Sequence, residues 1–141
     1  MATFNKYEKF AEDFANGVHD LVGTDHVLKV MLSNTAPNAA THAVRADAAE
    51  ISAGAGYTAG GVDIENDGTR TGGTLSVTGV DKTITASGGP IGPFRYAILY
   101  NDTPTSPADP LIGWWDYGSA ITLNDGEPLH LDFGAMVLEF E

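Results

Sequence analysis

The chain has 141 residues, of which 43% are hydrophobic, and a formal net charge of −12. Seven Lys and Arg residues against nineteen Asp and Glu residues exclude nucleic acid and an anionic membrane as direct partners, because phosphate groups are bound by clustered basic side chains. With no Cys, disulfides and thiolate chemistry are also excluded. The length predicts a single domain over residues 1–141, and 17 Gly and 7 Pro favour short strands joined by tight turns.

The N-terminal segment 1–18 is predicted to form an amphipathic helix or arm. Asn5 is the expected N-cap, with Glu8 three residues on, and Gly17 is expected to end the helix. One face carries an apolar stripe of Tyr7, Phe10, Ala11, Phe14 and Val18. Such a stripe has to be buried, either on the core of its own domain or on a neighbouring subunit. Periodicity leaves both alternatives open.

Partial alternation predicts a strand at 26–33. The Ala- and Gly-rich residues 34–61 have no clear period, which predicts a long surface segment with a helical turn near 43–50. Two Thr-rich stretches, 73–80 and 82–89, are predicted to be strands with at least one solvated face.

Residues 92–119 contain six of the thirteen aromatic side chains. Apolar side chains on both faces of 94–101 predict a central strand. Its even-numbered members are expected to share one face: Phe94, Tyr96, Ile98 and Tyr100. Three Pro residues in 101–110 predict a loop, and the β pattern resumes at 111–118.

Trp114 and Trp115 are adjacent, so in a strand their side chains point to opposite faces. In a sandwich, one of them must face inward. The other is left for the surface or for a subunit interface, where Trp is enriched at binding hot spots. Core packing therefore accounts for most of the aromatic residues in this stretch.

The C-terminal residues have the clearest β pattern. Residues 124–126, Asn-Asp-Gly, lie between two alternating runs and predict a hairpin. Apolar residues occupy odd positions before Gly134-Ala135 and even positions after it, which predicts a bulge or tight turn there. The predicted fold class is mainly β: an antiparallel β-sandwich or jelly-roll-like fold over 26–141, with the short N-terminal helix or arm over 1–18.

The sequence carries no recognisable catalytic or metal-binding motif. Residues 62–68 resemble the opening of an EF-hand calcium loop, but the twelfth position of that loop, which needs Glu, is Thr74. The four His residues lack the spacing of zinc ligands, and no Ser lies in a G-x-S-x-G motif. We therefore predict a protein that is not an enzyme and that uses no cofactor or metal.

Four long segments resemble a family of small structural proteins of tailed-bacteriophage virions, similar to head decoration (cement) proteins. They are KVMLSNTAP, AEISAGAGYTAGG, GPFRYAILYNDTP and DPLIGWWDYGSAITLNDGE, and the similarity covers residues 4–133. The middle of this chain is shorter than is usual in the family. The resemblance implies a protein made in the cytoplasm of the bacterial host that binds the outside of the assembled capsid. Its implied partners are the major capsid protein and further copies of itself, as a trimer in preference to a dimer.

We predict that partner contacts are made by aromatic residues of the N-terminal stripe and of the Trp pair: Tyr7, Phe10, Phe14, Trp114 and Trp115. A receptor- or glycan-binding module on the head or tail surface is the alternative. It would use the outward-facing Trp together with Asp116 and Tyr117.

Overall fold

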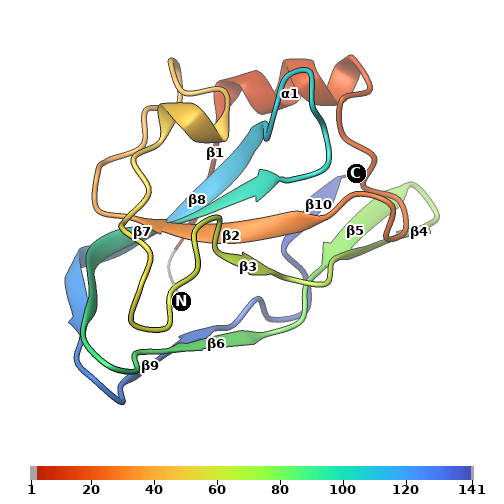
Figure 1. The fold of residues 1–141 in the computed structure, drawn as a ribbon. Coiled ribbons are helices and arrows are strands. Elements are labelled where there is room, and N and C mark those ends of the chain that lie inside the picture. The colour runs from red at the N-terminus through yellow and green to blue at the C-terminus, as the bar shows by residue number, and fades with distance from the viewer. Residues whose placement is uncertain (1–2, 141) are drawn as a thin grey trace.

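The computed structural model describes residues 3–140, so residues 1, 2 and 141 of the predicted domain lie outside the described residues. Ten strands, one α-helix and one short 3-10 helix lie within this range (Figure 1). In chain order they are β1 (Phe4–Lys6), α1 (Glu8–Ala15), β2 (Leu28–Ser33), η1 (Arg45–Asp47), β3 (Val62–Asp63), β4 (Asp67–Thr71), β5 (Thr74–Thr78), β6 (Lys82–Thr85), β7 (Ile91–Asn101), β8 (Leu111–Leu123), β9 (Pro128–Leu131) and β10 (Leu138–Phe140).

The strands form three antiparallel sheets. The largest has five strands in the order β1-β8-β7-β2-β3, and the smaller sheets have the orders β10-β5-β4 and β6-β9. Figure 1 shows α1 on one side of the five-stranded sheet and β6 and β9 on the other. The predicted class is confirmed: the protein is mainly β, with antiparallel sheets in a sandwich-like arrangement and a short helix near the N-terminus.

The five-stranded sheet is covered on both faces. On one face, Val30 and Leu99 join a large apolar core to which the two smaller sheets contribute. On the other face, Ile98 and Tyr100 join a smaller core that also contains Tyr7. Strand β7 lies between β8 and β2, so the prediction of a central strand is confirmed. Burial on both faces explains why apolar residues occupy successive positions in this strand.

The pairing of β7 with β8 departs from strict alternation near Phe94. Phe94 lies opposite Ile121, whereas Tyr96 lies opposite Asp116, so more residues of β8 than of β7 fit between the two pairs. This irregularity places Phe94 in the large core with Leu99, while Tyr96 lies in the smaller core. The predicted shared face for Phe94 and Tyr96 is therefore wrong, because a bulge redirects the side chains on one side of it.

The first residues of the described range form a strand that the sequence did not predict. Phe4 of β1 lies opposite Trp115 of β8. A Cβ at Gly113 would collide with the Phe4 ring, so only Gly permits this close approach. The predicted N-cap at Asn5 is wrong, because Asn5 is itself part of β1 and α1 begins only after Tyr7, which has no side-chain capping bond.

The Asn-Asp-Gly sequence forms a turn but not a hairpin. The Glu127 N–H donates to the Asn124 carbonyl at 2.9 Å, which closes the turn. Strand β9 then pairs with β6, with Leu129 opposite Ile84, instead of returning along β8. The hairpin prediction is therefore wrong: the chain leaves the five-stranded sheet at this turn and enters the two-stranded sheet.

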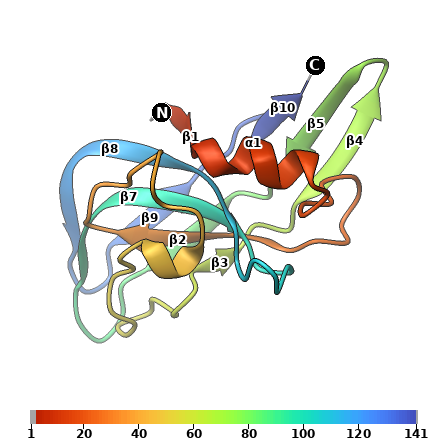
Figure 2. The same ribbon diagram turned by 90° about the horizontal axis from the view of Figure 1, so that it is seen from above.

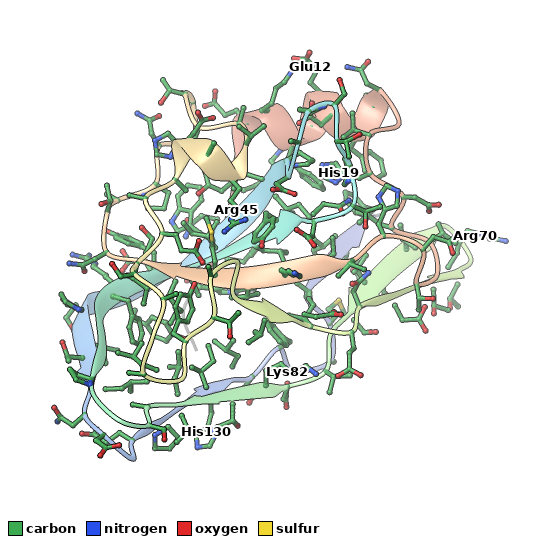
Figure 3. The ribbon with its side chains drawn as sticks, in the orientation of Figure 1. Glu12, His19, Arg45, Arg70, Lys82 and His130 are labelled. Carbon is green, nitrogen blue, oxygen red and sulfur yellow. The ribbon has the colours of Figure 1, made fainter. Side chains whose placement is uncertain are left out.

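The segment 34–61 is fastened by one carboxylate, and the predicted helical turn within it is confirmed as η1. Oε1 of Glu50 accepts hydrogen bonds from the Tyr57 hydroxyl at 2.7 Å and from the Gly60 N–H at 2.6 Å. Oε2 accepts from Arg45 at 2.8 Å, and Figure 3 shows Arg45 above the five-stranded sheet. Both carboxylate oxygens are thus used to tie parts of this irregular segment to one another. The segment meets the sheet at the Tyr57 hydroxyl, which accepts a hydrogen bond from the Leu32 N–H of β2 at 3.0 Å.

The predicted turn at Gly134-Ala135 is confirmed, and Phe140 packs against the large core beyond it. The switch to even positions is only partly right, because Val137 is buried whereas Met136 is exposed. The Val137 N–H donates to the carbonyl of its neighbour in β5 at 2.6 Å, which draws this residue into the core.

Candidate functional site

The three aromatic residues of the predicted N-terminal stripe differ in exposure. Tyr7 is fully buried with its ring centroid 4.7 Å from that of Trp114, and Phe10 is 3% exposed in the large core. Phe14, at the end of α1, is 38% exposed. Gly17, with φ 76°, follows the end of the helix as predicted. Tyr7 and Phe10 therefore contact this chain's own core, and Phe14 is the member that solvent reaches.

Phe14 lies beside two half-buried apolar residues of β10 and β5, Phe140 and Leu75. Its ring stacks on that of Phe140 in β10, with centroids 4.6 Å apart and planes inclined by 19°. Phe140 in turn lies opposite Leu75 of β5. Figure 2 shows α1 beside β10, with the β4–β5 hairpin extending beyond the rest of the molecule. We call this surface, made of Phe14, Phe140 and Leu75, the Phe14 patch.

The two Trp side chains lie on opposite faces of β8, as predicted. Trp114 packs on Tyr7 in the smaller core. Trp115 packs at the large core, with ring centroids 5.2 Å from Phe4 and 5.9 Å from Phe133. Both indoles are half-buried, so each combines contacts within the chain with a surface that remains accessible.

A cavity of about 340 Å³ lies beside Trp115, and we call it the Trp115 cavity. It is bounded by Val30, Ala97, Trp115, Tyr117, His130, Leu131, Asp132, Phe133 and Gly134. Side chains from β8 and from the end of β9 thus form one hollow, between strands that belong to different sheets. The sequence did not predict this cavity, because β8 and β9 were expected to pair in one hairpin, whereas they belong to different sheets.

A buried polar group beneath α1 was also missed. The Asn101 amide donates to Nδ1 of His19 at 3.1 Å and to Nδ1 of His26 at 2.9 Å. Burial, and secondarily the nearby His26, lowers the pKa of His19 to about 4. Burial raises the pKa of Asp13 on α1. Figure 3 shows His19 below α1, between the helix and the sheet. These residues form no recognisable motif in the sequence, so nothing in the sequence indicated this group.

Most basic side chains are neutralised within the chain. Five of the seven form ion pairs: Lys9 with Glu12, Lys29 with Asp102, Arg45 with Glu50, Lys82 with Glu65 and Arg95 with Asp116. The Arg95 guanidinium, at 2.8 Å, holds the pKa of the Asp116 carboxyl below its usual value. Asp116 is therefore already paired, and the unpaired carboxylates dominate the surface charge.

The described residues contain no arrangement of a known metal site. In the stretch that resembles a calcium loop, Asp63 Oδ1 accepts the Glu65 N–H at 2.8 Å, which makes a local turn. Among residues 3–140, no group of three or more His, Cys, Asp or Glu side chains is placed to hold a metal ion. In the same range, α1 falls well short of the length and apolar character that a membrane-crossing helix requires.

Comparisons with family models, with curated proteins and with solved structures give no match to this chain.

Proposed function

We propose that this protein is a bacteriophage head decoration protein, which binds the outer surface of the assembled capsid and stabilises it without catalysing a reaction. The resemblance of four long segments to that family carries the proposal. Three of these segments contribute β2, β7 and β8, and the fourth, 49–61, is bound to the same sheet where the Leu32 N–H donates to the Tyr57 hydroxyl at 3.0 Å. The resembling residues thus specify the fold, and the docking surface is sought among the exposed side chains.

The Phe14 patch supports docking through an apolar contact. Phe14 and Phe140 stack on each other at the surface, where two aromatic rings together offer a larger apolar area than scattered side chains do. Burying the exposed part of Phe14 against a partner would contribute roughly 1 kcal/mol or more before ordering costs. Phe10, which is buried in this chain, supports the patch from behind, because its ring centroid lies 6.0 Å from that of Phe14 and 6.0 Å from that of Phe140.

The charge distribution favours a basic partner surface. The chain carries a net charge of −12, and five of its seven basic side chains are paired internally. An acidic surface of this kind accelerates association with a positively charged surface. It disfavours nucleic acid and anionic membranes as partners, as the sequence also predicts.

Binding to heads tests the proposal directly. The chain would be mixed with heads assembled from the major capsid protein of the same phage genome and sedimented, and the bound copies counted by quantitative gel. Phe14→Ser should reduce the affinity roughly tenfold, because a tenfold change corresponds to about 1.4 kcal/mol, the order expected for burying the exposed part of this ring. Val80→Ser is the matched control, since Val80 is 51% exposed and lies outside the patch. Failure of the unaltered chain to bind heads would refute the decoration role.

The proposed assembly is a homotrimer, either in solution or formed on the shell. This preference follows the family resemblance, in which copies meet at symmetry axes of the capsid. Light scattering of the free chain and imaging of decorated heads would test it. Isolated single copies on the shell, together with a monomer in solution, would contradict the trimer while leaving decoration intact.

A receptor- or glycan-binding module on the virion surface is the second candidate. The observation that favours it is the joint presence of Trp115 and Tyr117 at one cavity, since sugar rings stack on aromatic side chains. Asp116, which the sequence suggested as a third group, is committed to Arg95. Screening the chain on a glycan array would test this function, and saturable binding of one glycan class with no binding to heads would establish it over the first.

A further inference from the structure

The Trp115 cavity is a hollow that opens to solvent, because its lining includes the exposed residues His130, Asp132 and Gly134. Its volume of about 340 Å³ falls at the lower end of the range of pockets that bind small ligands. Val30 and Ala97, which line it, are buried members of the large core. The surface left for a bound group is that of the half-buried Trp115 and Tyr117 rings, and a group that covers them gains dispersion contacts that the chain does not supply itself.

Three aromatic rings line this space: Trp115 and Tyr117 from β8, and Phe133 from the segment after β9. Aromatic faces attract cations because of their quadrupole, and they also pack well against aliphatic stems. The lining therefore suits a group that combines a short apolar stem with a positive charge.

A carboxylate supplies the complementary charge. Asp132 lines the cavity, and its Oδ1 accepts the Gly134 N–H at 2.8 Å, which fixes the orientation of the carboxylate. No Lys or Arg is among the lining residues. His130 also borders the cavity, but its Nδ1 is engaged with the Thr83 hydroxyl at 3.0 Å. The lining is thus apolar and acidic, which disfavours anionic groups.

We propose that the Trp115 cavity receives an arginine side chain of the capsid shell protein, with the guanidinium against the ring of Trp115 and paired with Asp132. Arginine fits better than lysine because its planar guanidinium both stacks on aromatic rings and pairs with a carboxylate through two hydrogen bonds. The identity of the partner rests on the proposed function, whereas the chemistry of the cavity does not.

The cavity chemistry is tested on the full chain by NMR, through the indole N–H signals of its two Trp residues. Titration with N-acetylarginine amide should move the Trp115 signal saturably and leave Trp114, on the opposite face of β8, nearly unmoved. Asp132→Asn should weaken this binding roughly tenfold, the size expected for losing a charge-assisted hydrogen bond. Glu139→Gln removes the same charge from an exposed position of β10, and should leave the binding unchanged.

Two neutral probes test the proposal against its alternatives. N-acetylcitrulline amide has the shape of the arginine probe without its charge, and equal binding would overturn the cation site. Galactose binding at lower concentration than the arginine probe would assign the cavity to a glycan instead.

Head binding then tests the partner. Asp132→Asn should reduce the occupancy of heads, and Glu139→Gln should not. Unchanged occupancy of Asp132→Asn, with the arginine response of Trp115 intact in the unaltered chain, would overturn the assignment to the capsid protein. If the unaltered chain does not bind heads at all, the decoration role fails, and the Trp115 titration still decides the cavity chemistry.

Discussion

The buried His19 predicts a loss of stability in mild acid. Its ring accepts a hydrogen bond from Asn101, and burial lowers its pKa from 6.5 to about 4. The unfolded chain therefore binds a proton at this residue between about pH 6.5 and pH 4 that the folded chain does not bind. Stability from the neutral ring is fully present above pH 6.5 and is lost as the pH falls through this window.

The size of the effect follows from the same values. Because one pKa unit corresponds to about 1.36 kcal/mol, the fall from 6.5 to about 4 corresponds to about 3 kcal/mol in full and to about 2 kcal/mol at pH 5. Asp13 acts in the opposite sense, because burial raises its pKa and its protonation in acid favours the folded state. The contribution of His19 is therefore best isolated by comparison with a variant that cannot titrate there.

His19→Asn supplies that comparison, since the Asn oxygen can still accept a hydrogen bond from Asn101. Urea unfolding would be measured for the unaltered chain and the variant at pH 7.5 and pH 5. Between these values, the unaltered chain should lose about 2 kcal/mol more than the variant. His130→Asn, at an exposed position, is the control and should follow the unaltered chain. Parallel losses in the unaltered chain and His19→Asn would refute the reasoning.

Four further substitutions test the packing around the candidate site and within the segment 34–61. Phe10→Ala should lower the free energy of unfolding by about 3–5 kcal/mol and Phe14→Ala by less than half as much, because Phe10 is 3% and Phe14 38% exposed. Urea titration measures both losses. Equal losses would contradict the conclusion that Phe10 is a core residue and Phe14 a surface residue. Tyr7→Phe should leave the melting temperature unchanged or raise it, because the buried hydroxyl has no hydrogen-bond partner among the described residues. Glu50→Gln should cost about 2–4 kcal/mol in urea, since an amide cannot accept with its NH2 group the hydrogen bond from Arg45; a loss below 1 kcal/mol would contradict the role of Glu50.

Local patterns in the sequence predict strands well because they depend on neighbours within a few residues. The central strand 94–101 and the turn at Gly134-Ala135 follow from alternation and from turn chemistry alone, and both are confirmed. The failed predictions concern contacts between distant residues. The turn closed by Glu127 has the local form of a hairpin turn, but β9 pairs with β6 and not with β8. The paired residues Thr83 and His130 are 47 positions apart in the chain.

The candidate site could be predicted only in part, because some of its contacts join residues that are distant in the sequence. The opposite orientation of Trp114 and Trp115 follows from the two-residue period of a strand. The Phe14 patch requires the contact between α1 and β10, and Phe14 and Phe140 lie at opposite ends of the chain. No periodicity within either segment specifies that contact.

The segments that carry the family resemblance and the groups proposed to bind partners are largely different parts of the chain. Phe14, Phe140 and Asp132 all lie outside the four resembling segments, whereas β2, β7 and β8 lie within them. If the resemblance reflects common descent, relatives would share the sheet that these segments form and would differ in the side chains that α1 and β10 expose. On the proposed decoration function, differences in capsid specificity between such relatives are expected at the Phe14 patch and at the Asp132 side of the Trp115 cavity. Replacing Phe14 and Asp132 by the residues of another such protein should alter which heads are bound, and should lower the unfolding free energy by less than half of the loss expected for Phe10→Ala, because both side chains are exposed.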